Sequence, residues 1–265
     1  MRWLLVILLL SLVPTAFAGT QTVGTVTIDP SSPIDLTLGS TKTVTCSATI
    51  TDTDNWNNIT TVNATIWDSI ASTEGASDND NEHYTVVSCD LGANTSATER
   101  PATCSFSLHY HANPSTWTCK IRSYNSTNDL ASNSNGATVN QLVALDVVGT
   151  SINFGDMALN ETSASDVSTT VQNVGNIRID VKLSGDSFSC SSGTLSPETA
   201  RYSATSGNSY ASMTELTGTA ITLDLDIAKS TGSPSTKDTY WKISIPNSGV
   251  GGSCSNTVTF SAVSG

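Results

Sequence analysis

The sequence predicts an all-β protein made of two consecutive β-sandwich domains after a cleaved export signal. Three observations lead to this prediction. The amino terminus has the parts of a secretory signal, several later segments alternate apolar and polar residues with the period of a half-buried strand, and each half of the chain holds an even number of cysteines, four in the first and two in the second. We therefore expect a signal peptide over 1–18, a sandwich with two disulfides over 19–140, and a sandwich with one disulfide over 141–265.

The signal peptide is predicted from the order of its residues. Arg2 precedes an apolar run over 4–13, and Ala16-Phe17-Ala18 provides the small residues of a cleavage site. The run is too short to span a bilayer comfortably, so we expect cleavage before Gly19 and no membrane span afterwards. An uncleaved membrane anchor is the alternative. The end of the chain, 258–265, has no hydrophobic tail, so retention at a cell surface would depend on other molecules.

The composition agrees with an exported β protein. Only 13% of the residues are charged, and Ser and Thr fill most polar positions, of which Thr suits the pleated surface of a strand. The net charge of -12, without a basic patch, excludes nucleic acid as an expected partner. We expect a secreted protein that works outside the cell or on its surface.

The cysteines are expected to form disulfides. Each half holds an even number, and disulfides persist in exported proteins. A zinc site would need closely spaced pairs such as Cys-x-x-Cys, and none occurs. Four cysteines allow three pairings, and spacing alone does not choose among them. The six residues are Cys46, Cys89, Cys104 and Cys119 in the first half, and Cys190 and Cys254 in the second.

Two strands in the first half carry a family resemblance. The segment 42–50 places Cys46 on the same face as its alternating apolar residues, and the segment 117–121 does the same for Cys119. These segments resemble the B and F strands of an immunoglobulin-like sandwich, whose inward cysteines meet across the core. The resemblance covers most of residues 20–140.

This resemblance implies a disulfide pairing. It joins Cys46 to Cys119, which leaves Cys89 to pair with Cys104, while Cys190 and Cys254 form the remaining bridge. A third alternating strand over 62–66 ends at Trp67, near where the immunoglobulin-like fold often keeps a core tryptophan. Trp67 is out of phase with the apolar face of that strand.

The second half also contains strands with one apolar and one polar face. The segments 177–183, 221–227 and 241–245 each alternate in this way. The turn-rich segment 133–136 is expected to end the first domain. The following segment, 142–148, is expected to serve as a strand shared by both domains, which would make a short and stiff connection.

A second resemblance concerns the start of this half. The sequence I-N-F-G-D at 152–156, followed by Q-N-V-G-N-I at 172–177, resembles the I-x-F-G and N-x-G-N pattern of immunoglobulin-like modules in Hydin-type and exported surface proteins. The segment 240–260 is similar to the last strands of secreted archaeal surface proteins. The resemblance implies a class that is mostly noncatalytic. Asn173 and Gly175 suit a turn, in which Gly is free to adopt positive φ.

Residues for catalysis are scarce. The chain has three histidines, no Gly-x-Ser-x-Gly or His-Glu-x-x-His motif and no phosphate-binding glycine loop. His109 and His111 flank Tyr110 on a strand end, which would point both imidazoles to one side, but the sequence offers no third ligand. Asp224 and Asp226 fit the polar face of a strand. We expect no enzyme activity, no cofactor and no metal.

One acidic segment offers an alternative to the prediction of no metal, namely a calcium site. Asp78, Asp80 and Glu82 place carboxylates at alternate positions, as a calcium loop does, but an EF-hand would need an acid twelve positions along, which is missing. A solvated acidic loop is the simpler interpretation. The chain also has five Asn-x-Ser/Thr triplets, the acceptor pattern for N-glycans. They begin at Asn58, Asn63, Asn94, Asn125 and Asn160.

Two functions agree with these features. The first is a noncatalytic structural subunit of a cell-surface filament or surface layer, which binds copies of itself or other surface proteins. The N-terminal segment 20–28 would then pair within its own domain or insert into the next subunit. The second is a secreted or surface-associated adhesin that binds a glycan or a protein through loops. Its candidate loops are 52–58, with Trp56, and 198–216, with Tyr202 and Tyr210.

Overall fold

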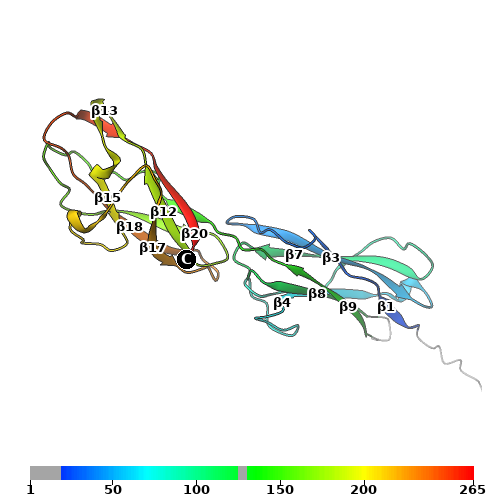
Figure 1. Ribbon diagram of the computed structural model, residues 1–265. Coiled ribbons are helices and arrows are strands. Elements are labelled where there is room, and N and C mark those ends of the chain that lie inside the picture. Colours follow the sequence, from blue (N-terminus) through cyan, green and yellow to red (C-terminus); the bar gives the residue numbers. More distant parts are fainter. Residues whose placement is uncertain (1–18, 125–129) are drawn as a thin grey trace, which may run out of the picture.

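The structure is a computed structural model that describes residues 19–124 and 130–265. The predicted signal peptide and Asn125 lie outside the described residues. Strands dominate the described chain, and its helical elements are short 3-10 turns, which confirms the all-β prediction. No described helix has the length and apolar character needed to cross a membrane. The strands form two groups that share no sheet, and these appear as two lobes joined end to end in Figure 1.

The first lobe consists of the strands β1 to β9 and has two antiparallel sheets that pack on one core. One sheet contains β1 (Gln21–Val23), β2 (Thr27–Asp29), β3 (Thr41–Asp52), β6 (Asp90–Leu91) and β7 (Glu99–His109). The other contains β4 (Thr61–Asp68), β5 (His83–Val86), β8 (Thr116–Tyr124) and β9 (Leu130–Thr138), and the 3-10 helix η1 (Trp56–Asn58) lies before β4.

The core of this lobe follows the predicted alternation. The apolar positions of β3 and β8 are buried and the positions between them are more exposed, because a strand turns successive side chains to opposite faces. The buried positions are Val44, Cys46, Ala48, Ile50, Trp117, Cys119 and Ile121. Trp67 is only half-buried. Trp117 is the buried indole instead, and its Nε1 donates to the carbonyl of Asn113 at 2.9 Å.

Three disulfides connect the strands. Cys46 on β3 is bonded to Cys119 on β8, so this bond joins the two sheets across the core of the first lobe. Cys89 is bonded to Cys104 on β7. The bond between Cys190 and Cys254 lies in the second lobe.

The prediction of a turn at 133–136 is wrong, because these residues lie inside β9 and pair with β8. Their composition suits an edge strand whose polar side chains have a specific task. Asn133 donates to the carbonyls of Val23 and Gly24, and Asn135 donates to the carbonyl of Val26, so β9 satisfies the backbone of the N-terminal segment. Pairing with β8 and these hydrogen bonds from side-chain amides outweigh the local preference for a turn.

The N-terminal segment pairs within its own lobe. Both β1 and β2 lie antiparallel to β3, and Val23, Val26 and Ile28 are buried in the first core. Of the two arrangements expected for residues 20–28, the structure has the intramolecular one.

The second lobe consists of β10 to β20, in three antiparallel sheets. The largest contains β10 (Leu145–Val148), β11 (Val167–Asn173), β18 (Ser235–Ile243), β15 (Ala200–Ser203) and β16 (Thr214–Glu215). A second contains β17 (Ile221–Ile227), β12 (Ile179–Gly185) and β20 (Val258–Ser264). A third contains β14 (Thr194–Leu195), β13 (Phe188–Ser192) and β19 (Gly251–Ser255), and the 3-10 helices are η2 (Pro197–Thr199) and η3 (Tyr210–Ser212).

The core of the second lobe lies between β12, β17 and β18. Ile179, Val181 and Leu183 on β12 are buried, as the predicted alternation requires, and they pack with Trp241 on β18. The strand predicted over 142–148 is shorter than expected. It starts at Leu145 and, among the described strands, pairs only with β11, so it belongs to the second lobe and is not shared. We propose that the domain boundary lies at residues 140 and 141.

Candidate functional site

The connection between the lobes is fixed by one buried side chain. Asn176, in the turn between β11 and β12, is fully buried. Its Nδ2 donates to the carbonyl of Ala112 at 3.0 Å and to that of Asn140 at 2.9 Å, and its Oδ1 accepts from the amide of Leu142 at 2.7 Å. A single amide thus satisfies backbone groups from the end of the first lobe and from the connecting chain.

Two neighbours in the same turn complete this arrangement. A Cβ on Gly175 would stand 2.0 Å from the carbonyl oxygen of Leu142, so glycine is required here because two backbones approach closely. The predicted turn is present, but Gly175 does not adopt a positive φ in it. Asn173 is also buried; its Oδ1 accepts from the amide of Gly175 at 2.9 Å, and its Nδ2 donates to the carbonyl of Ile177 at 2.7 Å. The N-x-G-N pattern therefore forms part of the contact between the lobes, through Asn176 and Gly175.

Further contacts cross the same junction. The hydroxyl of Tyr110 donates to Oγ of Ser230 at 3.2 Å in a buried position. The amine of Lys229 donates to Oδ1 of Asn113. Tyr110 also packs with Ala144 and Val174 in a small apolar cluster. Because the first of these hydrogen bonds is buried and the second is partly buried, separating the lobes would leave polar groups unsatisfied, and we expect one fixed orientation.

The three carboxylates proposed for calcium turn to different partners. Oδ1 of Asp78 lies 2.8 Å from Nδ1 of the buried His83. Oδ1 of Asp80 lies 3.6 Å from Nε2 of His109. Burial lowers the pKa of the Lys229 amine, and the charge of Glu82 partly opposes that shift. Calcium binding by this segment, which needs convergent oxygen ligands, stays a prediction.

Asp80 instead provides the partner that the histidine pair lacked in the sequence. One nitrogen of His109, one nitrogen of His111 and one carboxylate oxygen of Asp80 all lie within 4.8 Å of one another. The two imidazole rings are 5.2 Å apart between centroids. Burial lowers the pKa of His111, and the neighbouring His109 lowers it further. No sequence signal connects Asp80 to these histidines, because the contact forms only when the loop before β5 folds against the end of β7.

An open groove lies in the second lobe. It encloses a volume of about 1280 Å³. The chain from 149 to 159 lines one side without forming a strand, and its apolar residues Ile152, Phe154 and Met157 are only half-buried. Phe188 on β13 and Phe260 on β20 also line the groove. A groove of this size with aromatic walls can hold an extended ligand.

The aromatic residues of the predicted binding loops do not extend into solvent. Tyr202 is fully buried and its ring lies 5.3 Å from that of Trp241. Tyr210 is half-buried, with the guanidinium of Arg201 4.6 Å from its ring centre. Trp56 is covered in the same manner, by a guanidinium 5.4 Å from its ring. These side chains are packing groups and are not free anchors for a ligand.

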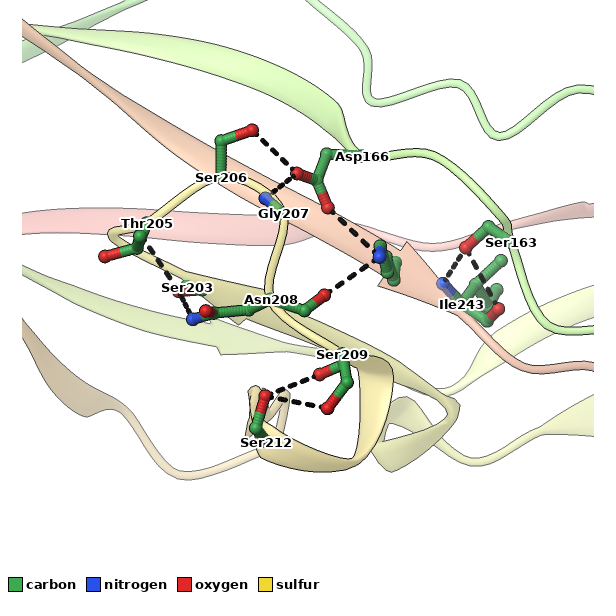
Figure 2. Close-up of polar contacts among 11 residues, drawn as sticks. Ser163, Asp166, Ser203, Thr205, Ser206, Gly207, Asn208, Ser209, Ser212 and Ile243 are labelled. Atoms are coloured by element: carbon green, nitrogen blue, oxygen red, sulfur yellow. Dashed lines mark hydrogen bonds and ion pairs between the residues drawn. The ribbon is translucent and has the colours of Figure 1, made fainter.

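An ion pair holds the loop that follows β15 (Figure 2). Asp166 and Lys242 lie 3.5 Å apart, with side chains only 11% and 10% exposed. Asp166 accepts from the amide of Gly207 at 2.6 Å and from Oγ of Ser206 at 2.9 Å, and Lys242 donates to the carbonyl of Asn208 at 2.9 Å. The bond from the Gly207 amide lowers the pKa of Asp166. The loop is therefore pinned to β18.

We predict that Asp166→Asn destabilises the second lobe by about 2 kcal/mol at neutral pH, because Lys242 then stays buried without its carboxylate. Since the folded pKa lies below the ordinary value of 3.8, the contribution of the carboxylate is present above that value and is lost as the pH falls through the lower folded pKa. Urea titrations at several pH values measure the difference. Asp224→Asn, on the exposed face of β17, is the control and should change stability by less than about 0.5 kcal/mol. Equal losses for both variants would contradict the buried pair.

The candidate glycosylation residues differ in exposure. Asn94 and Asn160 are exposed, whereas Asn58 and Asn63 are half-buried. Nδ2 of Asn58, the atom that a glycan would modify, donates to Asp52 at 3.2 Å. By exposure, Asn94 and Asn160 are better placed than the other two described asparagines, although Nδ2 of Asn94 also donates to the carbonyl of Ser96 at 3.2 Å, and glycosylation stays a prediction.

The chain is similar to several solved structures at low identity. No protein-family model matches its sequence, and no curated protein matches it. The chaperone–tip adhesion subunit complex CsuC–CsuE, from archaic Csu pili of Acinetobacter baumannii, matches with 11% identity and a TM-score of 0.38 over 92% of this chain and 99% of that chain. A solved structure from a study of carbohydrate-binding modules of the β-sandwich superfamily matches with 11% identity and a TM-score of 0.27 over 93% of this chain and 97% of that chain. The C-terminal domain of the antigen I/II-family protein AspA of Streptococcus pyogenes matches with 12% identity and a TM-score of 0.26 over 92% and 95%.

Proposed function

We propose that this protein is a noncatalytic extracellular building block, a subunit of a cell-surface filament or surface layer. The observation that carries the proposal is the buried junction around Asn176. A repeating assembly needs subunits with one fixed shape, because flexible joints lose orientational entropy each time a subunit is added. Three disulfides further support a role outside the cell, where such bonds persist.

Open sheet edges would supply the contacts between subunits. β17 pairs only with β12, so its other edge is unpaired within the described chain, and the exposed Ile221 lies at its start. An unpaired edge can accept a strand from a neighbouring molecule, and a lysine on it opposes such pairing. Contacts between copies are therefore expected to involve this edge.

Purified protein is expected to form fibres or sheets as its concentration rises, detected by sedimentation and electron microscopy. Ile221→Lys should raise the concentration needed for assembly about tenfold or more, since a lysine on the strand edge disfavours pairing. Leu38→Lys is the matched control, because Leu38 is an exposed apolar residue outside any strand, and it should assemble as wild type does. Assembly that is unaffected by Ile221→Lys would exclude this edge as the contact.

The groove in the second lobe favours a second candidate function, an adhesin that binds a glycan or a protein. Its half-buried Phe154 and Phe260 offer surfaces on which a sugar ring or an apolar side chain can stack. The assembly experiment separates the two functions. A protein that stays monomeric at high concentration and is retained on immobilised oligosaccharides would favour the adhesin.

A further inference from the structure

We propose that Asp80, His109 and His111 bind one divalent transition-metal ion of the zinc class at the junction end of the first lobe. The three residues come from two segments, the turn before β5 and the end of β7 with the chain that follows it. One ligand atom from each lies within 4.8 Å of the other two. Two imidazoles and one carboxylate are a donor set that suits zinc and its neighbours, whereas calcium prefers oxygen ligands alone.

One pair of ligand atoms is separated by about the distance found in a tetrahedral site. Metal–ligand bonds of about 2.0–2.2 Å place neighbouring ligand atoms about 3.3–3.6 Å apart in a tetrahedron. Oδ1 of Asp80 and Nε2 of His109 are already 3.6 Å apart. Their side chains are 52% and 38% exposed, so rotation about their side-chain bonds can bring them onto an ion. Three protein ligands leave the fourth position open for water.

His111 supplies the independent observation that points to a ligand. Its side chain is fully buried, and its Nε2 has no hydrogen-bond partner among the residues that the structure describes. Buried polar atoms are normally satisfied, so an orphaned imidazole nitrogen requires an explanation. A metal ion bound at Nε2 satisfies it. The other ring nitrogen, Nδ1, lies 3.3 Å from the side-chain amide of Asn81, which also faces the carbonyls of His111 and Ser230.

Tyr84 holds the two segments of the site together. Its hydroxyl donates to the carbonyl of Asp80 at 2.6 Å and accepts from the amide of His109 at 3.0 Å. The backbones of two of the three ligands are therefore joined through one oxygen before any ion arrives. Lys229, whose charge acts on His111, donates its amine to Asn113 and not to the cluster. A preorganised site of this kind loses little entropy when it binds.

Histidine NMR with zinc chloride as the probe tests the proposal directly, because the chain contains only three histidines. His83 is the internal reference, since Nδ1 faces Asp78 and Nε2 faces the carbonyl of Glu74. We expect one equivalent of zinc to shift the ring-nitrogen signals of His109 and His111 and to leave those of His83 in place. Zinc that shifts neither His109 nor His111 would overturn the proposal.

Calorimetric zinc titrations of variants locate the ligands. His109→Ala should weaken binding at least about 100-fold and Asp80→Asn about tenfold, while Tyr84→Phe should weaken it about tenfold by loosening the site. Asp78→Asn removes the same charge from the same loop outside the cluster and should stay within about twofold of wild type. Because His109 and Asp80 are partly exposed, these variants are expected to fold even if a His111 variant does not. Equal losses of zinc affinity for Asp78→Asn and Asp80→Asn would show that the negative charge of the loop attracts zinc without specific ligands. That result would also overturn the proposal.

Discussion

Replacing Cys46 and Cys119 together by alanine is expected to lower the free energy of unfolding of the first lobe by about 5 kcal/mol. The bond spans 73 residues, and closing a loop of that length stabilises a fold by about 4 kcal/mol in the chain-entropy model. Both cysteines are fully buried, so the shorter alanine side chains also leave a gap, which adds about 1 kcal/mol. A domain is stable by about 5–15 kcal/mol in total, so the lobe would lie near its unfolding threshold.

The bridge between Cys190 and Cys254 is the matched control for this variant. It closes a loop of similar length, 64 residues, but Cys254 is exposed and Cys190 is only half-buried. Its double alanine variant should lose the entropic contribution alone, again about 4 kcal/mol. Differential scanning calorimetry of the two variants measures both losses. A smaller loss at Cys46 and Cys119 than at the control pair would contradict the role assigned to the buried bridge.

Asn176→Ala is expected to destabilise the junction by about 3 kcal/mol and to release the lobes from one another. The variant leaves two carbonyls and one amide without their partner, and each unsatisfied buried backbone group costs about 1–3 kcal/mol, reduced where water can enter. Small-angle X-ray scattering should show a single extended shape for the wild type and a range of lobe orientations for the variant.

Asn140→Ala controls for the removal of an amide near the same place. The side chain of Asn140 makes an exposed hydrogen bond of 2.8 Å to Asp35, so its loss should cost less than about 0.5 kcal/mol and leave the scattering unchanged. Gly175→Ala should resemble Asn176→Ala, because its Cβ would collide with the carbonyl oxygen of Leu142. If Asn176→Ala scatters as the wild type does, the amide does not hold the lobes together.

The cores of both lobes could be predicted from the sequence because their strands alternate strictly. Cys46 on β3, Trp117 on β8 and Val181 on β12 all lie on the predicted buried face. Each of these strands pairs on both sides, so one of its faces must be apolar, and this requirement is visible in the order of residues.

Edge strands and turns were harder to predict. β9 contains Asn133, Asn135 and Gly136, which locally favour a turn, and its extended shape comes from pairing with β8. The sequence places Gly175 in the correct turn, but glycine is required there because Leu142 approaches closely, and that contact depends on a chain more than thirty residues away. Contacts of this kind carry no periodic signal.

The candidate sites could be predicted only in part. The sequence pairs His109 with His111 on one strand end, but it places Asp80 in a separate acidic segment, for which a solvated loop is the simpler interpretation and calcium the alternative. The groove is lined by segments from 147 to 260, which no spacing rule connects. Tyr202 was proposed as a binding residue and is buried beside Trp241, because an aromatic residue in a loop sequence can still lie on a strand.

Electron microscopy of the native cell surface and culture fluid, with an antibody against the folded protein, tests the structural role most directly. We predict labelled fibres or a lattice in which each subunit appears as two lobes of fixed orientation. Dispersed single molecules, with no labelled ordered structure at any growth stage, would contradict the proposal that this chain is the subunit of a surface assembly.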